Sequence, residues 1–123
     1  MKKISILMAV YNEVQNIEEC LLRVKEVQIP NFEKQIIISD NFSNDGTRET
    51  LLKLQEKEND PNIIFLFRDK NDGKGANIIN ALNHSSGEIA IIQDSDLEYD
   101  PIEYQSLITP ILKGKAEAVY GTR

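Results

Sequence analysis

The segment "IAIIQDSDLEYDP", residues 89–101, joins an apolar run directly to a group of acidic side chains. Asp94, Asp96 and Glu98 stand at alternate positions, and carboxylates this close repel one another unless a cation, water or hydrogen-bond donors compensate them. Residues two apart on an extended chain point the same way, so Asp94 and Asp96 are expected to face one spot. A divalent cation with oxygen ligands would relieve the repulsion and could hold a diphosphate at the same time.

The elements that must position these acids alternate between apolar runs and amphipathic stretches. Short continuous apolar runs predict buried strands, and apolar residues at spacings of three and four predict helices. The expected strands are residues 4–10, 35–39, 62–68, 88–93 and 116–123, and the expected helices are residues 14–27, 47–57, 76–84 and 101–113. In the helix at 76–84, the expected inward side consists of Ile78, Ile79 and Leu82. This alternation predicts one α/β domain with a mostly parallel sheet and helices on both faces.

Length and composition agree with a single domain over residues 1–123 and exclude several classes of protein. A net charge of −6 disfavours a nucleic-acid-binding surface. No segment approaches the ~20 apolar residues of a membrane span. Cys20 is the single cysteine and His84 the single histidine, which excludes an internal disulfide and a Cys/His zinc site. This cysteine usage agrees with a reducing compartment, so we expect a cytoplasmic protein.

Polar side chains follow each of the first four expected strands. In strand order they are Tyr11, Asn12 and Glu13; Asp40 and Asn41; Arg68 and the loop "NDGKG"; and Asp94, Ser95 and Asp96. Ligands of open α/β sheets bind at the carboxyl ends of the strands. The convergence of polar residues on those ends therefore predicts a binding site there.

Each of these features taken alone also has a purely structural explanation. Asp40 and Asn41 could begin a turn by bonding their own backbone, Asp45 could simply cap the helix at 47–57, and Tyr11 could pack on the sheet. The loop "NDGKG" could be an ordinary turn with a solvated lysine, and it lacks the Walker pattern of a P-loop. The paired aspartates are the feature that a turn explains least well.

Taken together, the motifs resemble a known family. The blocks "MAVYNE", "SDNFSNDGT", "KNDGKGANIINAL", "SGEIAIIQDSDLEYDP" and "VYGTR" are similar in order and spacing to family 2 glycosyltransferases of the GT-A fold. The block "QDSDLEYDP" most resembles the branch of dolichyl-phosphate mannose synthase and related polyprenyl-phosphate sugar transferases. The resemblance implies a Rossmann-like nucleotide-diphospho-sugar transferase domain that uses a UDP- or GDP-linked donor and Mg²⁺ or Mn²⁺. It also implies an inverting transfer, with a polyprenyl or dolichyl phosphate as the expected acceptor.

The resemblance further implies roles for individual residues. The implied nucleotide-sugar-binding residues are Ala9, Tyr11, Glu13, Asp40, Arg68, Gly73, Lys74, Gly75, Asp94 and Ser95; the implied catalytic residues are Asp94, Asp96 and Arg123; the implied metal ligands are Asp94 and Asp96. Tyr11 and Glu13 would line the nucleoside pocket, and Asp40 would read the edge of the base. Arg68 and Lys74 would lie near the base or the diphosphate, where Gly73 and Gly75 allow close backbone approach. Asp94 would hold the ribose side, Asp96 the metal, and Arg123 a phosphate of donor or acceptor.

The chain departs from the family pattern in two residues and in its ending. Ala9 stands where proline is usual, and Asn41 where a second aspartate is common. Family members continue beyond the last motif with the acceptor half of the site. We therefore expect a donor-binding part, truncated after the Gly-Thr-Arg strand and weak or inactive alone, whose full-length parent acts at the cytoplasmic face of a membrane.

Two other functional classes remain as alternatives. The first is a non-catalytic module that binds a nucleotide sugar. The second is a phospho-acceptor receiver domain, which would need a phosphorylated aspartate after the third strand and a lysine after the fifth. Here Arg68 and Gly121 stand at the ends of those strands, which disfavours the receiver.

Overall fold

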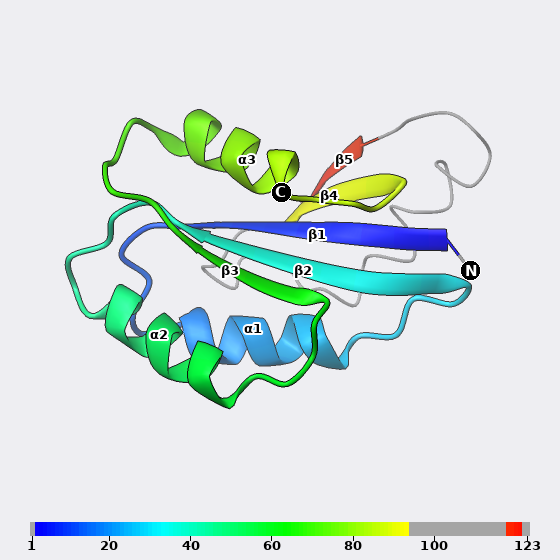
Figure 1. Cartoon of the computed structure of the whole chain (residues 1–123), viewed down its shortest axis with the longest axis horizontal. Coiled ribbons are helices and arrows are strands. Elements are labelled where there is room, and N and C mark those ends of the chain that lie inside the picture. Colours follow the sequence, from blue (N-terminus) through cyan, green and yellow to red (C-terminus); the bar gives the residue numbers. More distant parts are fainter. Residues whose placement is uncertain (1, 94–117, 122–123) are drawn as a thin grey trace.

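A five-stranded parallel sheet with helices on both faces forms the architecture in the computed structural model, which describes residues 2–93 and 118–121 (Figure 1). The elements are β1 (Lys2–Val10), α1 (Ile17–Glu26), β2 (Phe32–Asp40), α2 (Thr47–Lys57), β3 (Ile63–Phe67), α3 (Lys74–Asn83), β4 (Ile89–Gln93) and β5 (Ala118–Gly121). The predicted α/β class and the parallel sheet are confirmed. The helix predicted at 101–113 lies outside the described residues.

The strand order β3-β2-β1-β4-β5 places a switch in chain direction beside β1. The chain first runs outward from β1 through β2 to β3, and then returns to the other side of β1 for β4. The register pairs Val10 with Asp40 and Asp40 with Phe67, so β1, β2 and β3 end level with one another. We call this end of the sheet the carboxyl edge. Such a switch point is where open α/β sheets usually bind ligands.

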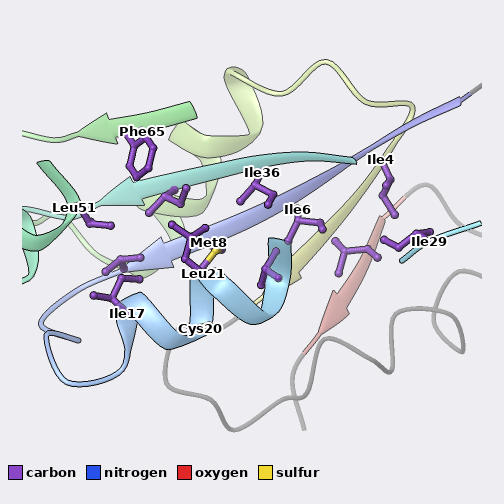
Figure 2. Packing of buried hydrophobic residues seen from close by; sticks show 14 of the residues in the cluster. Ile4, Ile6, Met8, Ile17, Cys20, Leu21, Ile29, Ile36, Leu51 and Phe65 are labelled. Carbon is purple, nitrogen blue, oxygen red and sulfur yellow. The ribbon is translucent and has the colours of Figure 1, made fainter. Parts of the chain in front are cut away.

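The larger part of the core lies between the sheet and the helices α1 and α2, on the face opposite α3 (Figure 1). Figure 2 shows Ile6 and Met8 of β1 packed near Leu21 and Cys20 of α1. The buried residues of α1 are Ile17, Cys20, Leu21 and Val24, which is the spacing of one helical face.

The helix α1 begins at Ile17, later than the predicted start at residue 14. Residues 14–16 form a turn instead, in which the N–H groups of Asn16 and Ile17 both donate to the Glu13 carbonyl, at 3.0 Å and 2.9 Å. The N–H groups of Glu13 and Val14 donate to the side chains of Thr47 and Asp45, at 2.8 Å and 3.4 Å. The loop after β2 therefore holds the backbone that leads into α1.

The inward face of α3 differs from the predicted one. Ile79 and Leu82 are 57% and 46% exposed, whereas Asn77 and Ala81 are buried. Ser39 Oγ donates to Asn77 Oδ1 at 2.6 Å, and Asn77 Nδ2 donates to the Ser39 carbonyl at 2.9 Å. Of the three residues expected to face inward, Ile78 does pack against the core, and a satisfied, buried polar pair takes the place of the other two.

None of the helices in the described part of the chain is both long and apolar enough to cross a membrane.

Gly87, just before β4, approaches β1 too closely to carry a side chain. Its N–H donates to Ser5 Oγ at 2.8 Å, and an added Cβ would lie 2.5 Å from that oxygen and 2.7 Å from Ser5 N. We therefore expect Gly87→Ala to lower the free energy of unfolding by about 1–3 kcal/mol, measured by urea denaturation. Gly75→Ala is the matched control, because that glycine is helical and its Cβ would meet nothing within 4 Å. A Gly87→Ala protein as stable as the control would contradict the close approach.

Candidate functional site

The carboxylate of Asp40 is the centre of a hydrogen-bonded cluster at the carboxyl edge. Asp40 is the last residue of β2 and is 0% exposed. Its Oδ1 accepts from Ser43 Oγ at 2.6 Å, and its Oδ2 accepts from Ser43 N at 3.1 Å and from Arg48 Nε at 3.0 Å. A turn and the first turn of α2 are thus both bound to the end of β2.

The loop after β1, which carries Tyr11 and Glu13, is attached to the same cluster. Asn12 N donates to Ser43 Oγ at 2.9 Å, and Asn12 Oδ1 accepts from Asn44 N at 2.9 Å. Asn12 has a φ of 53°, a left-handed conformation that asparagine tolerates better than most residues. Tyr11 remains 43% exposed beside it, so its ring is accessible at the carboxyl edge.

Arg68, the first residue after β3, points its guanidinium back toward the end of β2. Its Nη1 donates to Asn41 Oδ1 at 3.2 Å. The same guanidinium binds both carboxylate oxygens of Asp72, with Nη1–Oδ1 at 2.5 Å and Nη2–Oδ2 at 3.0 Å. Hydrogen bonding from Arg68 holds the pKa of Asp72 below its usual range. Arg68 is therefore a preorganised fork of donors, the geometry that carboxylates and phosphates share.

The start of α3 favours an anion. Its N-cap, Gly73, has a φ of 102° and supplies no side-chain cap, and the first turn contains no acidic residue. The first turns of α1 and α2, by contrast, both carry glutamates. The helix opens with the exposed Lys74. Positive charge and the N–H groups of a helix start both attract phosphate groups.

The structure brings most of the predicted site residues in the described ranges to the carboxyl edge: Tyr11, Glu13, Asp40, Arg68, Gly73, Lys74 and Gly75. Ala9 lies one residue before the end of β1, paired with Ser39. Asp94, Ser95, Asp96 and Arg123 lie outside the described residues. The base-reading role of Asp40 stays a prediction, and its carboxylate is buried and already bonded.

A polar pocket of about 260 Å³ opens beside the loop after β1 and is lined by Asn12, Glu13, Val14, Gln15, Asn16 and Asp45. It is smaller than the ~300–1,000 Å³ typical of small-molecule sites. Within residues 2–93 and 118–121, no group of three or more His, Cys, Asp or Glu side chains is placed to hold a metal ion.

The sequence interpretation missed Arg48 and Ser43, which connect the parts of the cluster. Arg48 looked like an ordinary polar residue in the first turn of a helix, and no local pattern pairs it with Asp40. Ser43 carried a weak signal, because serine often bonds the backbone or an aspartate within a turn. Both became visible only through the contacts of Asp40.

Residues 5–123 match the family described as Glycosyl transferase family 2. The chain belongs to this family. Over 115 residues it is 31% identical to an undecaprenyl-phosphate 4-deoxy-4-formamido-L-arabinose transferase of Salmonella choleraesuis (strain SC-B67). That alignment covers 92% of this chain and 35% of the relative, so the chain spans about a third of the length of the curated relatives it matches.

Solved structures share the fold of this family 2 chain. A mannosyltransferase from Pyrobaculum calidifontis, in complex with GDP-Man and Mn²⁺, has a TM-score of 0.69 and 26% identity over 81% of this chain and 29% of that one. S. aureus TarS 1-349, in complex with UDP-GlcNAc, has a TM-score of 0.71 and 24% identity over 90% of this chain and 31% of that one. These similarities confirm the predicted Rossmann-like GT-A fold.

Asp45 joins the loops after β1 and β2 and should make stability depend on pH. Its Oδ1 accepts from Thr47 N at 3.0 Å and from Thr47 Oγ1 at 2.5 Å, and its Oδ2 accepts from Val14 N at 3.4 Å. Desolvation alone would raise the pKa of Asp45, but these hydrogen bonds lower it below its usual range. The stability that results is present above the unfolded-state pKa and is lost as the pH falls through the lower folded-state pKa.

We expect Asp45→Asn to have a lower Tm than wild type at about pH 7, and the gap to close as the pH falls below about 3.9, the ordinary value for aspartate. Thermal unfolding across this range measures the gap. Asp69→Asn, at an exposed aspartate in the loop after β3, is the control. A gap that stays constant with pH would show that the Asp45 charge does not contribute.

Proposed function

We propose that this chain is the donor-binding domain of an inverting, metal-dependent glycosyltransferase, which transfers a sugar from a nucleoside-diphosphate sugar. One observation carries the proposal. The ends of β1, β2 and β3 and the start of α3 present a single bonded set of polar groups at the carboxyl edge of a family 2 chain. The sugar-nucleotide complexes of similar proteins support the same substrate class.

The described residues suit the two halves of such a donor. The exposed ring of Tyr11 offers a flat apolar surface for a nucleobase. Lys74 and the uncapped start of α3 offer positive charge and N–H groups for a diphosphate. Arg68 follows β3, away from β4, and its fork of donors would serve the nucleoside side of the donor.

The metal ion belongs to the same proposal. Asp94 directly follows Gln93, where β4 ends between β1 and β5 in the sheet, and Asp96 stands two residues further on. Their oxygen ligands suit Mg²⁺ or Mn²⁺, and Mn²⁺ accompanies GDP-Man in the similar mannosyltransferase. Such an ion would neutralise the charge that develops on the leaving nucleoside diphosphate.

The proposed acceptor is a polyprenyl phosphate, with the full-length protein acting at the cytoplasmic face of a membrane. The name of the Salmonella relative, which refers to undecaprenyl phosphate, supports this choice. The chemistry agrees with it, because a phosphate monoester with a second pKa of about 6 is already anionic near neutral pH. It can attack the anomeric carbon without the general base that a sugar hydroxyl needs. Arg123 would help guide its charge.

We expect a nucleoside diphosphate to bind this chain more tightly with Mn²⁺ or Mg²⁺ than with EDTA. Calorimetry with UDP, GDP, CDP and dTDP measures the affinities. At a nucleotide concentration about a hundred times Kd, binding should also add about 2.7 kcal/mol to the free energy of unfolding, seen as a rise in Tm. Asp96→Asn should remain folded and lose the metal dependence. Asp60→Asn, just before β3 and away from the carboxyl edge, should keep it. Equal affinity with metal and with EDTA would remove the metal from the proposal.

For the acceptor, we expect the full-length protein to move radiolabelled sugar into the lipid phase when it is given its donor and a polyprenyl phosphate. Parallel reactions contain oligosaccharide or protein acceptors in place of the lipid. The physical reason is the existing charge of the phosphate nucleophile, so the rate should fall as that phosphate is protonated below about pH 6. Label found only in saccharide, with every donor tested, would refute the lipid acceptor.

A further inference from the structure

Arg48 makes four contacts that all lead to the carboxyl edge. Its Nε donates to Asp40 Oδ2 at 3.0 Å, and its Nη2 donates to the carbonyl of Arg68. The guanidinium also lies over two aromatic rings, 5.5 Å from the centroid of Phe42 and 5.4 Å from that of Phe67. Both ring distances are within the range of a cation–π contact, so the planar group is held on its faces as well as at its edge.

The pair that Arg48 forms with Asp40 is buried on the acid side. Asp40 is 0% exposed, and the side chain of Arg48 is 24% exposed. A carboxylate removed from water is very costly without a cation or several donors, and breaking such a pair by removing one partner leaves the other charge uncompensated. The conformation around Asp40 therefore depends on the presence of Arg48.

Two routes connect this pair to predicted donor-binding residues. On the first, Asp40 binds Ser43, and Ser43 Oγ accepts the N–H of Asn12, the residue directly after Tyr11. On the second, Arg48 holds the carbonyl of Arg68 itself. Arg48 thus acts on one loop through its charge and on another through a backbone bond.

Phe42, in the turn between Asp40 and Ser43, has an unfavourable backbone conformation. It has a φ of 65°, which is unfavourable for a bulky L-residue, and it is 52% exposed, so burial does not explain the conformation. Its ring lies against the Arg48 guanidinium, and this contact compensates part of the cost. The turn from Asp40 to Ser43 is consequently fixed from both ends.

We propose that Arg48 is the positioning residue for the nucleoside side of the donor site: by compensating the buried Asp40 carboxylate and holding the Arg68 carbonyl, it sets the places of Tyr11 and Arg68. Asp40 contributes to this positioning through Ser43 and Arg48. This inference rests on the proposed function, because the residues that Arg48 positions are assigned to the donor there.

The test is a double-mutant cycle on Arg48 and Asp40 followed by thermal unfolding, together with calorimetry of UDP, GDP and inorganic pyrophosphate, all with Mn²⁺. Arg48→Met should weaken binding of the preferred nucleoside diphosphate by about tenfold or more, because a buried charge is left unpaired beneath the loop of Tyr11. Pyrophosphate, which lacks the nucleoside, should change by no more than about twofold. Asp40→Asn/Arg48→Met should recover most of the Tm that Arg48→Met loses, since no unpaired charge remains.

The controls separate positioning from general damage. Arg23→Met removes an arginine from the exposed ion pair with Glu19 on α1 and should leave both affinities unchanged. Arg48→Lys keeps the charge without the fork and should fall between wild type and Arg48→Met. Equal losses for nucleoside diphosphate and pyrophosphate, or a double variant with no higher Tm than Arg48→Met, would overturn the proposal.

Amide hydrogen exchange of the free protein tests the route from Arg48 through Ser43 to Asn12 without any nucleotide. Arg48→Met, or Arg48→Lys if the first variant does not fold, should speed exchange at Asn12 N–H, which Ser43 Oγ accepts, while Ile6 within β1 keeps its protection. Unchanged protection at Asn12 would refute the relay. If wild type binds no nucleoside diphosphate, the proposed function fails for this chain, and the exchange result still stands for or against Arg48.

Discussion

A carboxylate buried at the end of a central strand is the constraint from which the geometry of the carboxyl edge follows. Asp40 has no exposed surface, so its negative charge must be satisfied within the protein. Ser43 supplies two of its hydrogen bonds and Arg48 the third, and this set closes the turn after β2 onto the strand. Because the same serine also binds Asn12, one charge fixes the turn, the helix α2 and the loop after β1 together.

The last two residues of β2 attach the sheet to a helix on each face. Successive residues of a strand point to opposite sides, so Ser39 and Asp40 act in opposite directions. Ser39 binds Asn77 of α3 through two hydrogen bonds, and Asp40 binds Arg48 of α2. Apolar packing along β1 and β2 brings the layers together, but it is not directional. The hydrogen bonds of the two polar pairs are directional, and both pairs lie at the carboxyl edge, where the other polar residues gather.

This division explains what the sequence could predict. Continuous apolar runs are local, so the strands and the parallel α/β class followed from them, and topology alone placed Tyr11, Asp40 and Arg68 at one edge. The pairings between distant residues had no local signal. Arg48 and Asn77 each bind a partner across the fold, and neither was singled out. On α3 the prediction was wrong for Ile79 and Leu82, which are exposed, for the same reason: periodicity cannot tell a buried asparagine with a distant partner from an exposed one.

The order of strands also constrains how a donor would lie. Arg68 follows β3, and the order β3-β2-β1-β4 puts three strand spacings, about 14 Å in all, between the ends of β3 and β4. The helix α3, which opens with Lys74, packs over β1 and β2 between them. If the metal binds after β4, the diphosphate belongs near Asp94 and the start of α3, which leaves Arg68 for the nucleoside side. That is the side on which Arg48 holds the carbonyl of Arg68, so on this arrangement Arg48 would act beneath the nucleoside, the part of the donor that differs between nucleotides.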